Sequence, residues 1–216
     1  MSIAHHPPEE LLAAFAAGTL DAGEHLVVAV HASRCARCRS FVHAVEGLGG
    51  SALERTEPVA MSAGSFAAAM ARIENSAAQK GVAVNPVPPD LDEAHLPAVL
   101  RSYQIGSRRW VAPGVSLNPI RLPDAGRSRA FLLRSGPGTR MLEHSHTGTE
   151  LTCVIKGSFS HDGGRFGPGD FDFGDGEVDH QPIVGSEEPC LCVVAMTGDL
   201  KLNGFLGRLI SPFVRL

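Results

Sequence analysis

Apolar side chains recur at helical spacing through the first third of the chain. Leu11, Leu12 and Phe15 lie on one face of a helix when placed at 3.6 residues per turn, and Gly18 then ends that segment. Asp21 is a suitable N-cap for the next helix. The pattern predicts four helices, at about residues 7–17, 22–32, 35–47 and from 62 or 65 to 73. The glycines at 47, 49 and 50 predict a break after the third.

This pattern is interrupted between residues 75 and 97. Prolines and acidic residues gather there, with few large apolar side chains, a composition typical of a linker. We therefore expect a helical domain at 1–85, a proline-rich linker at 86–97 and a second domain at 98–216.

After the linker, helical spacing gives way to short β-prone segments between Gly, Pro and Asn turns. The clearest are residues 129–134, 151–155 and 189–195. Several short strands at near-regular spacing favour an antiparallel sandwich or barrel. The expected fold class is therefore α+β, with a small helical bundle followed by an antiparallel β-barrel of the jelly-roll type.

Composition narrows the class of protein. The chain has 216 residues, enough for one or two domains, and carries a net charge of −4. This charge gives no reason to expect nucleic acid or an anionic membrane as a partner. Five cysteines are an odd number, which disfavours a secreted disulfide framework. The sequence shows neither a signal-peptide pattern nor an apolar run of about 18 residues, so we expect a cytoplasmic protein.

A metal-ligand spacing lies between the second and third predicted helices. His31, Cys35 and Cys38 are four and three residues apart, so they share a helix face, and the two cysteines bracket one turn if the helix breaks there. Two thiolates and an imidazole can converge on one tetrahedral Zn²⁺. A closed structural site needs a fourth ligand, for which we favour His6. The candidates are His5, His6, His25 and His43.

Other interpretations of this triplet exist. Cys35 and Cys38 could be a redox pair, although no strand–turn–helix context of the thioredoxin type precedes them. They could also be two small buried residues. Arginines at 34, 37 and 39 are expected to favour the thiolate form that binds metal.

A second constellation lies within the β-rich region. His144 and His146 alternate by two, so on a strand they face the same way, and Glu150 shares their parity. Two imidazoles and a carboxylate suit zinc, iron, nickel or manganese. His180, which follows the Gly167–Asp170 turn, is the natural fourth ligand from a neighbouring strand.

Residues 138–157 match the first cupin motif at each defined position: Gly138, His144, His146, Glu150 and Gly157. The second cupin motif is present only in part. Gly169, Asp170 and His180 are there, but the usual proline before the histidine and the asparagine after it are not.

A helical head with a His/Cys metal spacing, joined to a cupin, resembles the ChrR-type zinc anti-sigma factors over nearly the whole chain. The resemblance includes the His31/Cys35/Cys38 triplet, the cupin ligands and Cys190-Leu191-Cys192. It implies a head that binds an extracytoplasmic-function sigma factor and keeps it from core RNA polymerase. It also implies a cupin that senses singlet oxygen or organic hydroperoxides.

The same resemblance implies two metal sites. The head would hold a structural Zn²⁺ on His6, His31, Cys35 and Cys38. The cupin would hold a second divalent metal on His144, His146, Glu150 and His180, in the first place Zn²⁺, with iron, manganese or nickel as alternatives. The protein would not be an enzyme and would bind one sigma factor, without direct contact to nucleic acid or membrane.

Two alternatives accompany this interpretation. The β-domain could be a cupin metallo-enzyme, a dioxygenase or isomerase, with the head as an accessory zinc module. Separately, Cys190 and Cys192 lie two apart on a predicted strand. They could be small apolar core residues or could react with an oxidant.

Overall fold

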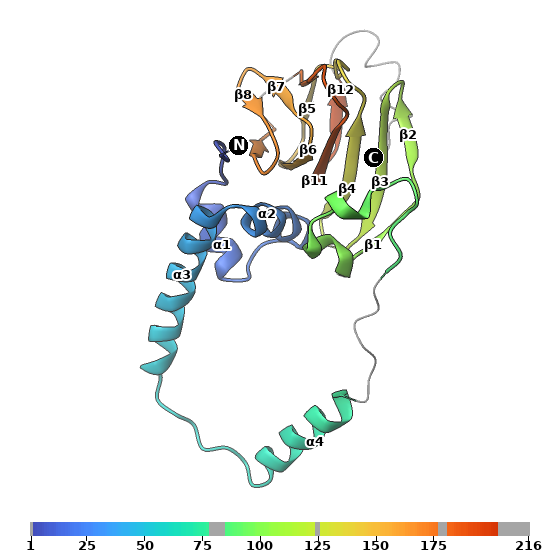
Figure 1. The fold of residues 1–216 in the computed structure, drawn as a ribbon. Helices are drawn as coiled ribbons and strands as arrows, with labels where there is room; N and C mark the ends of the chain where they lie inside the picture. The colour runs from blue at the N-terminus through green and yellow to red at the C-terminus, as the bar shows by residue number, and fades with distance from the viewer. Residues whose placement is uncertain (1, 78–84, 124–125, 177–180, 203–216) are drawn as a thin grey trace.

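The computed structural model describes residues 2–77, 85–123, 126–176 and 181–202 (Figure 1). Its helices are α1 (Glu9–Ala16), α2 (Ala22–Arg34), α3 (Ala36–Glu54) and α4 (Ser65–Ala77), with two short 3₁₀ turns, η1 (Glu93–His95) and η2 (Ala98–Ser102). Its strands are β1 (Gln104–Ile105), β2 (Arg109–Ala112), β3 (Val115–Arg121), β4 (Ser128–Ser135), β5 (His144–His146), β6 (Glu150–Lys156), β7 (Phe159–His161), β8 (Gly164–Phe166), β9 (Phe171–Gly174), β10 (Ile183–Val184), β11 (Cys190–Thr197) and β12 (Leu200–Leu202).

The strands form one large antiparallel sheet and two small ones. The large sheet has the order β1-β3-β4-β11-β6-β9, with β2 also paired to β3. The smaller sheets are β10-β7-β8 and β12-β5. The predicted α+β class is confirmed. The strands predicted at 129–134 and 151–155 lie within β4 and β6, and the one predicted at 189–195 begins one residue before β11. Over the described residues the large sheet does not close on itself, whereas the sequence predicts a β-barrel.

Local sequence explains the helix boundaries. Gly18 has a φ of 68° just after α1, a conformation that favours glycine and ends the helix. Asp21 caps α2 in a capping box with Glu24. Cys35 has an extended backbone and is both the C-cap of α2 and the N-cap of α3. The chain therefore turns at the first cysteine of the metal spacing.

The predicted break at 47–50 is wrong, because α3 continues to Glu54. A glycine inside a helix costs only about 1 kcal/mol relative to alanine. That cost is too small to end a helix whose neighbours keep the helical hydrogen bonds.

Helix α2 joins the helices to the large sheet. It packs against β4, β6 and β11, and its side chains Leu26, Val27, Val28 and Val30 have no exposed surface. They belong to one apolar cluster with Leu151 and Val193 of the sheet, among others. Each such side chain contributes about 1.5–3 kcal/mol when fully buried, so α2 is a central part of the core of the molecule.

The segment predicted as a linker contacts this core. Leu91 and Leu96 are buried in the cluster that contains α2. Asp90 accepts a hydrogen bond from Arg108 Nε at 3.0 Å, and the side chains of both residues are partly buried. The division at 86–97 stays a prediction, but residues 90–97 lie against the β-domain.

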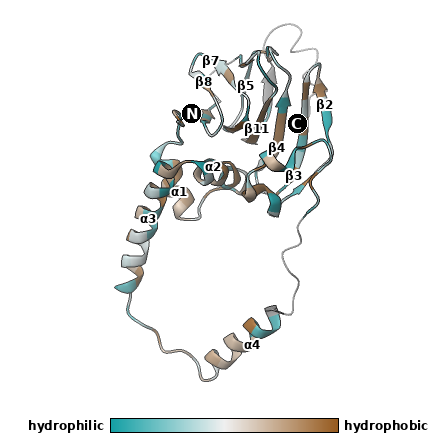
Figure 2. Cartoon of the chain, viewed as in Figure 1, coloured by the Kyte–Doolittle hydropathy of each residue, from teal (hydrophilic) through white to brown (hydrophobic). Residues whose placement is uncertain are grey.

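Helix α4 stands apart from the other elements (Figure 1). Phe66, Met70 and Ile73 recur along it at helical spacing and are 73%, 40% and 60% exposed. Figure 2 shows hydrophobic residues along this helix where no other element covers it. Over the described residues, no helix has the length and apolar character needed to cross a membrane.

Candidate metal centres

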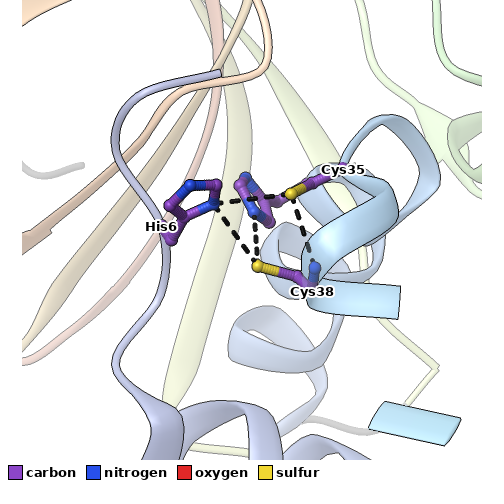
Figure 3. A group of neighbouring side chains, drawn as sticks. His6, Cys35 and Cys38 are labelled. Carbon is purple, nitrogen blue, oxygen red and sulfur yellow. Dashed lines mark hydrogen bonds between the residues drawn. The ribbon is translucent and has the colours of Figure 1, made fainter. Parts of the chain in front are cut away.

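Four residues from the N-terminal segment and from the α2–α3 region form the first candidate centre (Figure 3). His6 comes from the segment before α1, His31 from the last turn of α2, Cys35 from the junction and Cys38 from the first turn of α3. One ligand atom of each lies within 4.8 Å of the others. The structure thus brings together all four residues predicted for this site.

The distances among these atoms suit a tetrahedral ion. His6 Nδ1 lies 3.4 Å from Cys35 Sγ and 3.5 Å from Cys38 Sγ, and His31 Nε2 lies 3.2 Å from Cys38 Sγ. Zinc bonds of about 2.3 Å to sulfur and about 2.0 Å to nitrogen place tetrahedral ligands about 3.5 Å apart. The donor set of two thiols and two imidazoles is also one that zinc prefers.

The other candidate histidines have different neighbours. The ring of His5 lies against Phe166, with centroids 4.2 Å apart. His25 stacks on Phe15, and His43 pairs with Glu46. His6 is therefore the histidine that reaches this group from the N-terminal segment.

Burial sets the protonation states of the metal-free residues. Burial lowers the pKa of His31 to about 4 and raises the pKa of Cys38 to about 12. Burial, followed by the charge of Arg37, also lowers the pKa of His6. The imidazoles are thus neutral and ready to bind metal, whereas Cys38 is a thiol that must lose its proton.

The three arginines expected to favour the thiolates differ in their effect on Cys38. Arg34 donates to the carbonyl oxygen of Ile155 at 2.8 Å, and Arg39 donates to that of Ala32 at 2.7 Å. The guanidinium groups of Arg34 and Arg39 are thus hydrogen-bonded to backbone carbonyl oxygens and not to the cysteines. Arg37 does lower the pKa of Cys38, but the effect of burial is larger.

A residue from the β-domain completes the surroundings of His31. The Nδ1–H of His31 donates to the carbonyl oxygen of Gly169 at 2.8 Å. This bond fixes the ring so that Nε2 faces the cysteines. Sequence spacing could not reveal it, because the partners are 138 residues apart and a carbonyl has no sequence signature.

The second candidate centre comprises His144 and His146 of β5 and Glu150 at the start of β6. His146 Nε2 lies 3.0 Å from Glu150 Oε2. His144 Nδ1–H donates to the carbonyl oxygen of Leu142 at 2.7 Å, and this bond orients the imidazole ring. The predicted fourth ligand, His180, lies outside the described residues.

Cys190 and Cys192 lie on the face of the large sheet that packs against β7 and β8, opposite the face that α2 covers. Their sulfurs lie 3.6 Å apart, and both side chains are buried. The hydrogen bond between the two sulfurs, together with burial, raises the pKa of Cys192. Neighbouring apolar side chains include Val194 and Met196, so the pair is part of the β-domain core.

Comparisons with known proteins agree with this architecture. Residues 101–198 match the family described as ChrR Cupin-like domain. The anti-sigma-E factor ChrR of Cereibacter sphaeroides is 38% identical over 220 residues, covering 100% of both chains. That relative is a regulator and not an enzyme.

A solved structure extends the similarity to three dimensions. It is described as Rhodobacter sphaeroides SigE in complex with the anti-sigma ChrR. The match has a TM-score of 0.76 and 34% identity, and covers 90% of this chain and 100% of that chain. The helical region followed by a cupin β-domain is thus common to both, and the chain belongs to the ChrR family of anti-sigma factors.

Proposed function

We propose that this protein binds an extracytoplasmic-function sigma factor through its zinc-bound N-terminal region and releases it under oxidative stress. The stress signal would be singlet oxygen or an organic hydroperoxide, received by the cupin domain. The observation that carries the proposal is the full-length similarity to an anti-sigma factor and to a ChrR chain solved with SigE.

The proposed structural metal is Zn²⁺ on His6, His31, Cys35 and Cys38. Support comes from the donor set and from ligand-atom distances of 3.2–3.5 Å, close to those around tetrahedral zinc. When bound, the ion joins the N-terminal segment to the α2–α3 junction. The role proposed for the ion is structural.

A second divalent metal is proposed for the cupin. His144, His146 and Glu150, with His180 as a fourth ligand, would hold Zn²⁺ or alternatively iron, manganese or nickel. The support is the convergence of the three described side chains. This site belongs to the domain in which we place the sensing step.

The sigma factor would dock on apolar surface that the fold leaves uncovered. Phe66 and Met70 of α4 are exposed, as are Leu48 and Leu53 in the second half of α3. Amphipathic helices present such side chains to the apolar grooves of partners. This surface lies within residues 1–85, the proposed binding domain, on the other side of the 86–97 linker from the proposed sensor at 98–216.

The first test is co-expression of the full chain with extracytoplasmic-function sigma factors, followed by pull-down and in vitro transcription. We expect a stable complex that silences transcription, and loss of that complex with Cys35→Ala or Cys38→Ala. Cys190→Ala is the matched control, because it removes a buried thiol outside both metal groups. Equal binding by the Cys38→Ala variant and the control would contradict a role for zinc in partner binding.

The sensing step is tested on the assembled complex. Exposure to an organic hydroperoxide is expected to free the sigma factor from the wild-type protein. The Glu150→Ala variant, which lacks one proposed cupin ligand, is expected to retain it. Release at the same rate from both proteins would place the sensing step outside the cupin metal group.

A further inference from the structure

The turn between β8 and β9 contacts the first metal centre although it belongs to the cupin. This turn, Gly167–Asp170, lies against both the N-terminal segment and the end of α2. Its Gly169 carbonyl accepts the His31 Nδ1–H bond at 2.8 Å. The turn therefore touches one of the four predicted ligands directly.

The Asp170 carboxylate of the turn holds the segment that delivers another ligand. Its Oδ1 accepts hydrogen bonds from the backbone N–H of Ala4 at 2.7 Å and of His5 at 3.0 Å. Its Oδ2 accepts one from Gly167 at 2.8 Å, and the side chain is only 7% exposed. One buried carboxylate thus joins the turn to the residues just before His6.

The strand that follows the turn adds a backbone contact to the same segment. The N–H of Phe171, the first residue of β9, donates to the carbonyl oxygen of His5 at 3.2 Å. His6 precedes α1 and lies in no helix or strand. Within the described residues, the hydrogen bonds of Ala4 and His5 to the cupin therefore fix the path of the chain into His6.

Steric fit supports a specific contact at this place. Gly169 has a φ of 92°, and a Cβ added there would lie 2.6 Å from Cδ1 of Ile3. Such a distance is too short for two carbons. The positive φ favours glycine at this position, and a side chain there would also displace that of Ile3.

We propose that Asp170 and the β8–β9 turn are positioning elements of the N-terminal metal site, so that the cupin controls how firmly the head holds its metal. Asp170 acts through the backbone of Ala4 and His5 on His6, and Gly169 acts through Nδ1 on His31. This inference rests on the proposed metal site of the head.

The same turn is connected to the second candidate centre. β9 begins directly after Asp170 and pairs with β6, where Gly174 lies opposite Glu150. β9 therefore runs from the turn beside the first centre to a position opposite Glu150 of the second centre.

The test uses full-length protein loaded with Co²⁺, because thiolate-to-cobalt charge-transfer absorption reports only a site with cysteine ligands. The measurement is the affinity for Co²⁺ in competition with a chelator. Asp170→Ala is expected to weaken it by up to the roughly 10–100-fold that follows loss of a direct outer partner of a metal ligand, because Asp170 acts on His6 through the backbone of Ala4 and His5. Asp170→Asn is expected to be intermediate, because the amide oxygen can still accept from Ala4 and His5 while its NH₂ group faces the Gly167 N–H.

Asp172→Ala is the matched control. Asp172 lies in β9, two residues after Asp170. Its carboxylate pairs with His161 at 2.9 Å, whereas that of Asp170 accepts hydrogen bonds from Ala4 and His5. It is expected to keep wild-type Co²⁺ affinity.

Three outcomes would overturn the inference. Wild-type affinity in Asp170→Ala would show that the turn does not position the ligands. An equal loss in Asp172→Ala would show a general effect of damage to the cupin. Absence of thiolate–cobalt absorption in the wild-type protein would overturn the proposed metal site itself, and this inference with it.

Discussion

At the residue scale, the first metal centre combines a histidine that is already deprotonated with a cysteine that must lose a proton to bind metal. His31 is neutral at neutral pH because burial lowers its pKa to about 4, whereas burial raises the pKa of the Cys38 thiol to about 12. A metal therefore competes with no proton at His31 but must displace one at Cys38. The buried thiol keeps the metal-free site uncharged at this position, which suits its apolar surroundings.

This proton competition predicts a pH dependence of zinc binding. Because the Cys38 proton is released on binding, the zinc association constant should fall at least about tenfold for each unit decrease in pH near neutrality. The measurement is competition with a chelator between about pH 6.5 and pH 8. In the Cys38→Ala variant the slope should decrease by one proton. A wild-type affinity that does not change with pH would contradict Cys38 as a ligand.

At the element scale, α2 serves the metal centre and the core together. Its C-terminal turn supplies His31, its N-cap residue Asp21 accepts from the N–H of Arg127 at 3.1 Å, and Gly23 donates to Ser128 Oγ at 3.0 Å. Both ends of the helix are thus bonded to the β-domain. The helix that supplies His31 is thus held on the β-domain at both ends.

Gly23 tests this close packing. A Cβ at this position would lie 2.5 Å from Ser128 Oγ and 2.9 Å from Ser128 Cβ. Gly23→Ala should therefore lower the free energy of unfolding by about 1–3 kcal/mol, the usual cost of overpacking. Gly47→Ala in α3 is the control, since a Cβ there meets nothing within 4 Å and should stabilise the helix by up to about 1 kcal/mol. Denaturant titrations of both variants measure the difference, and equal effects would contradict the packing argument.

Truncation of an exposed side chain of α4 should weaken sigma-factor binding without lowering the stability of the protein. Phe66 is 73% exposed, so Phe66→Ala should leave the unfolding free energy within about 0.5 kcal/mol of wild type. If this side chain anchors the sigma factor, its truncation should weaken binding about 10–100-fold. Calorimetric titration with the purified sigma factor measures this. Trp110→Ala on β2, also an exposed aromatic, should bind as wild type does, and an equal loss in both variants would argue against α4 as the docking element.

Sequence spacing could predict those features that depend on near neighbours in the chain. The strand segments, the Asp21 cap and the grouping of His31 with Cys35 and Cys38 follow from periodicity and local geometry. Whether α3 continues past Gly47 depends on a small free-energy difference between continuing and ending the helix. The presence of glycines alone does not decide its sign. The bond from Gly169 to His31 joins residues 138 apart, so no local pattern contains it.

At the scale of the whole molecule, the helices and the sheet share one core. The cluster that includes Leu12 of α1, Leu26 of α2 and Val42 of α3 continues without interruption to Leu132 and Leu151 of the sheet. Composition suggested a head that stands by itself behind a linker. The packing of α2 between the other helices and the sheet instead ties the stability of the head to that of the cupin.

This shared core predicts that α1–α3 and the β-domain unfold together. Removal of the cupin contact would expose the α2 side chains that pack on the sheet, at about 1.5–3 kcal/mol for each large apolar residue, so an intermediate with only the sheet folded should not accumulate. Thermal unfolding of the full chain should therefore give one transition that coincides for circular dichroism at helical wavelengths and for the β-sheet band of the infrared amide absorption. Chelation of the metal should lower the midpoint of both signals equally. The metal would hold His31 at the end of α2, and both the other helices and the sheet pack against α2. Two separate midpoints, with only the helical one sensitive to chelation, would instead indicate a head that folds independently of the cupin.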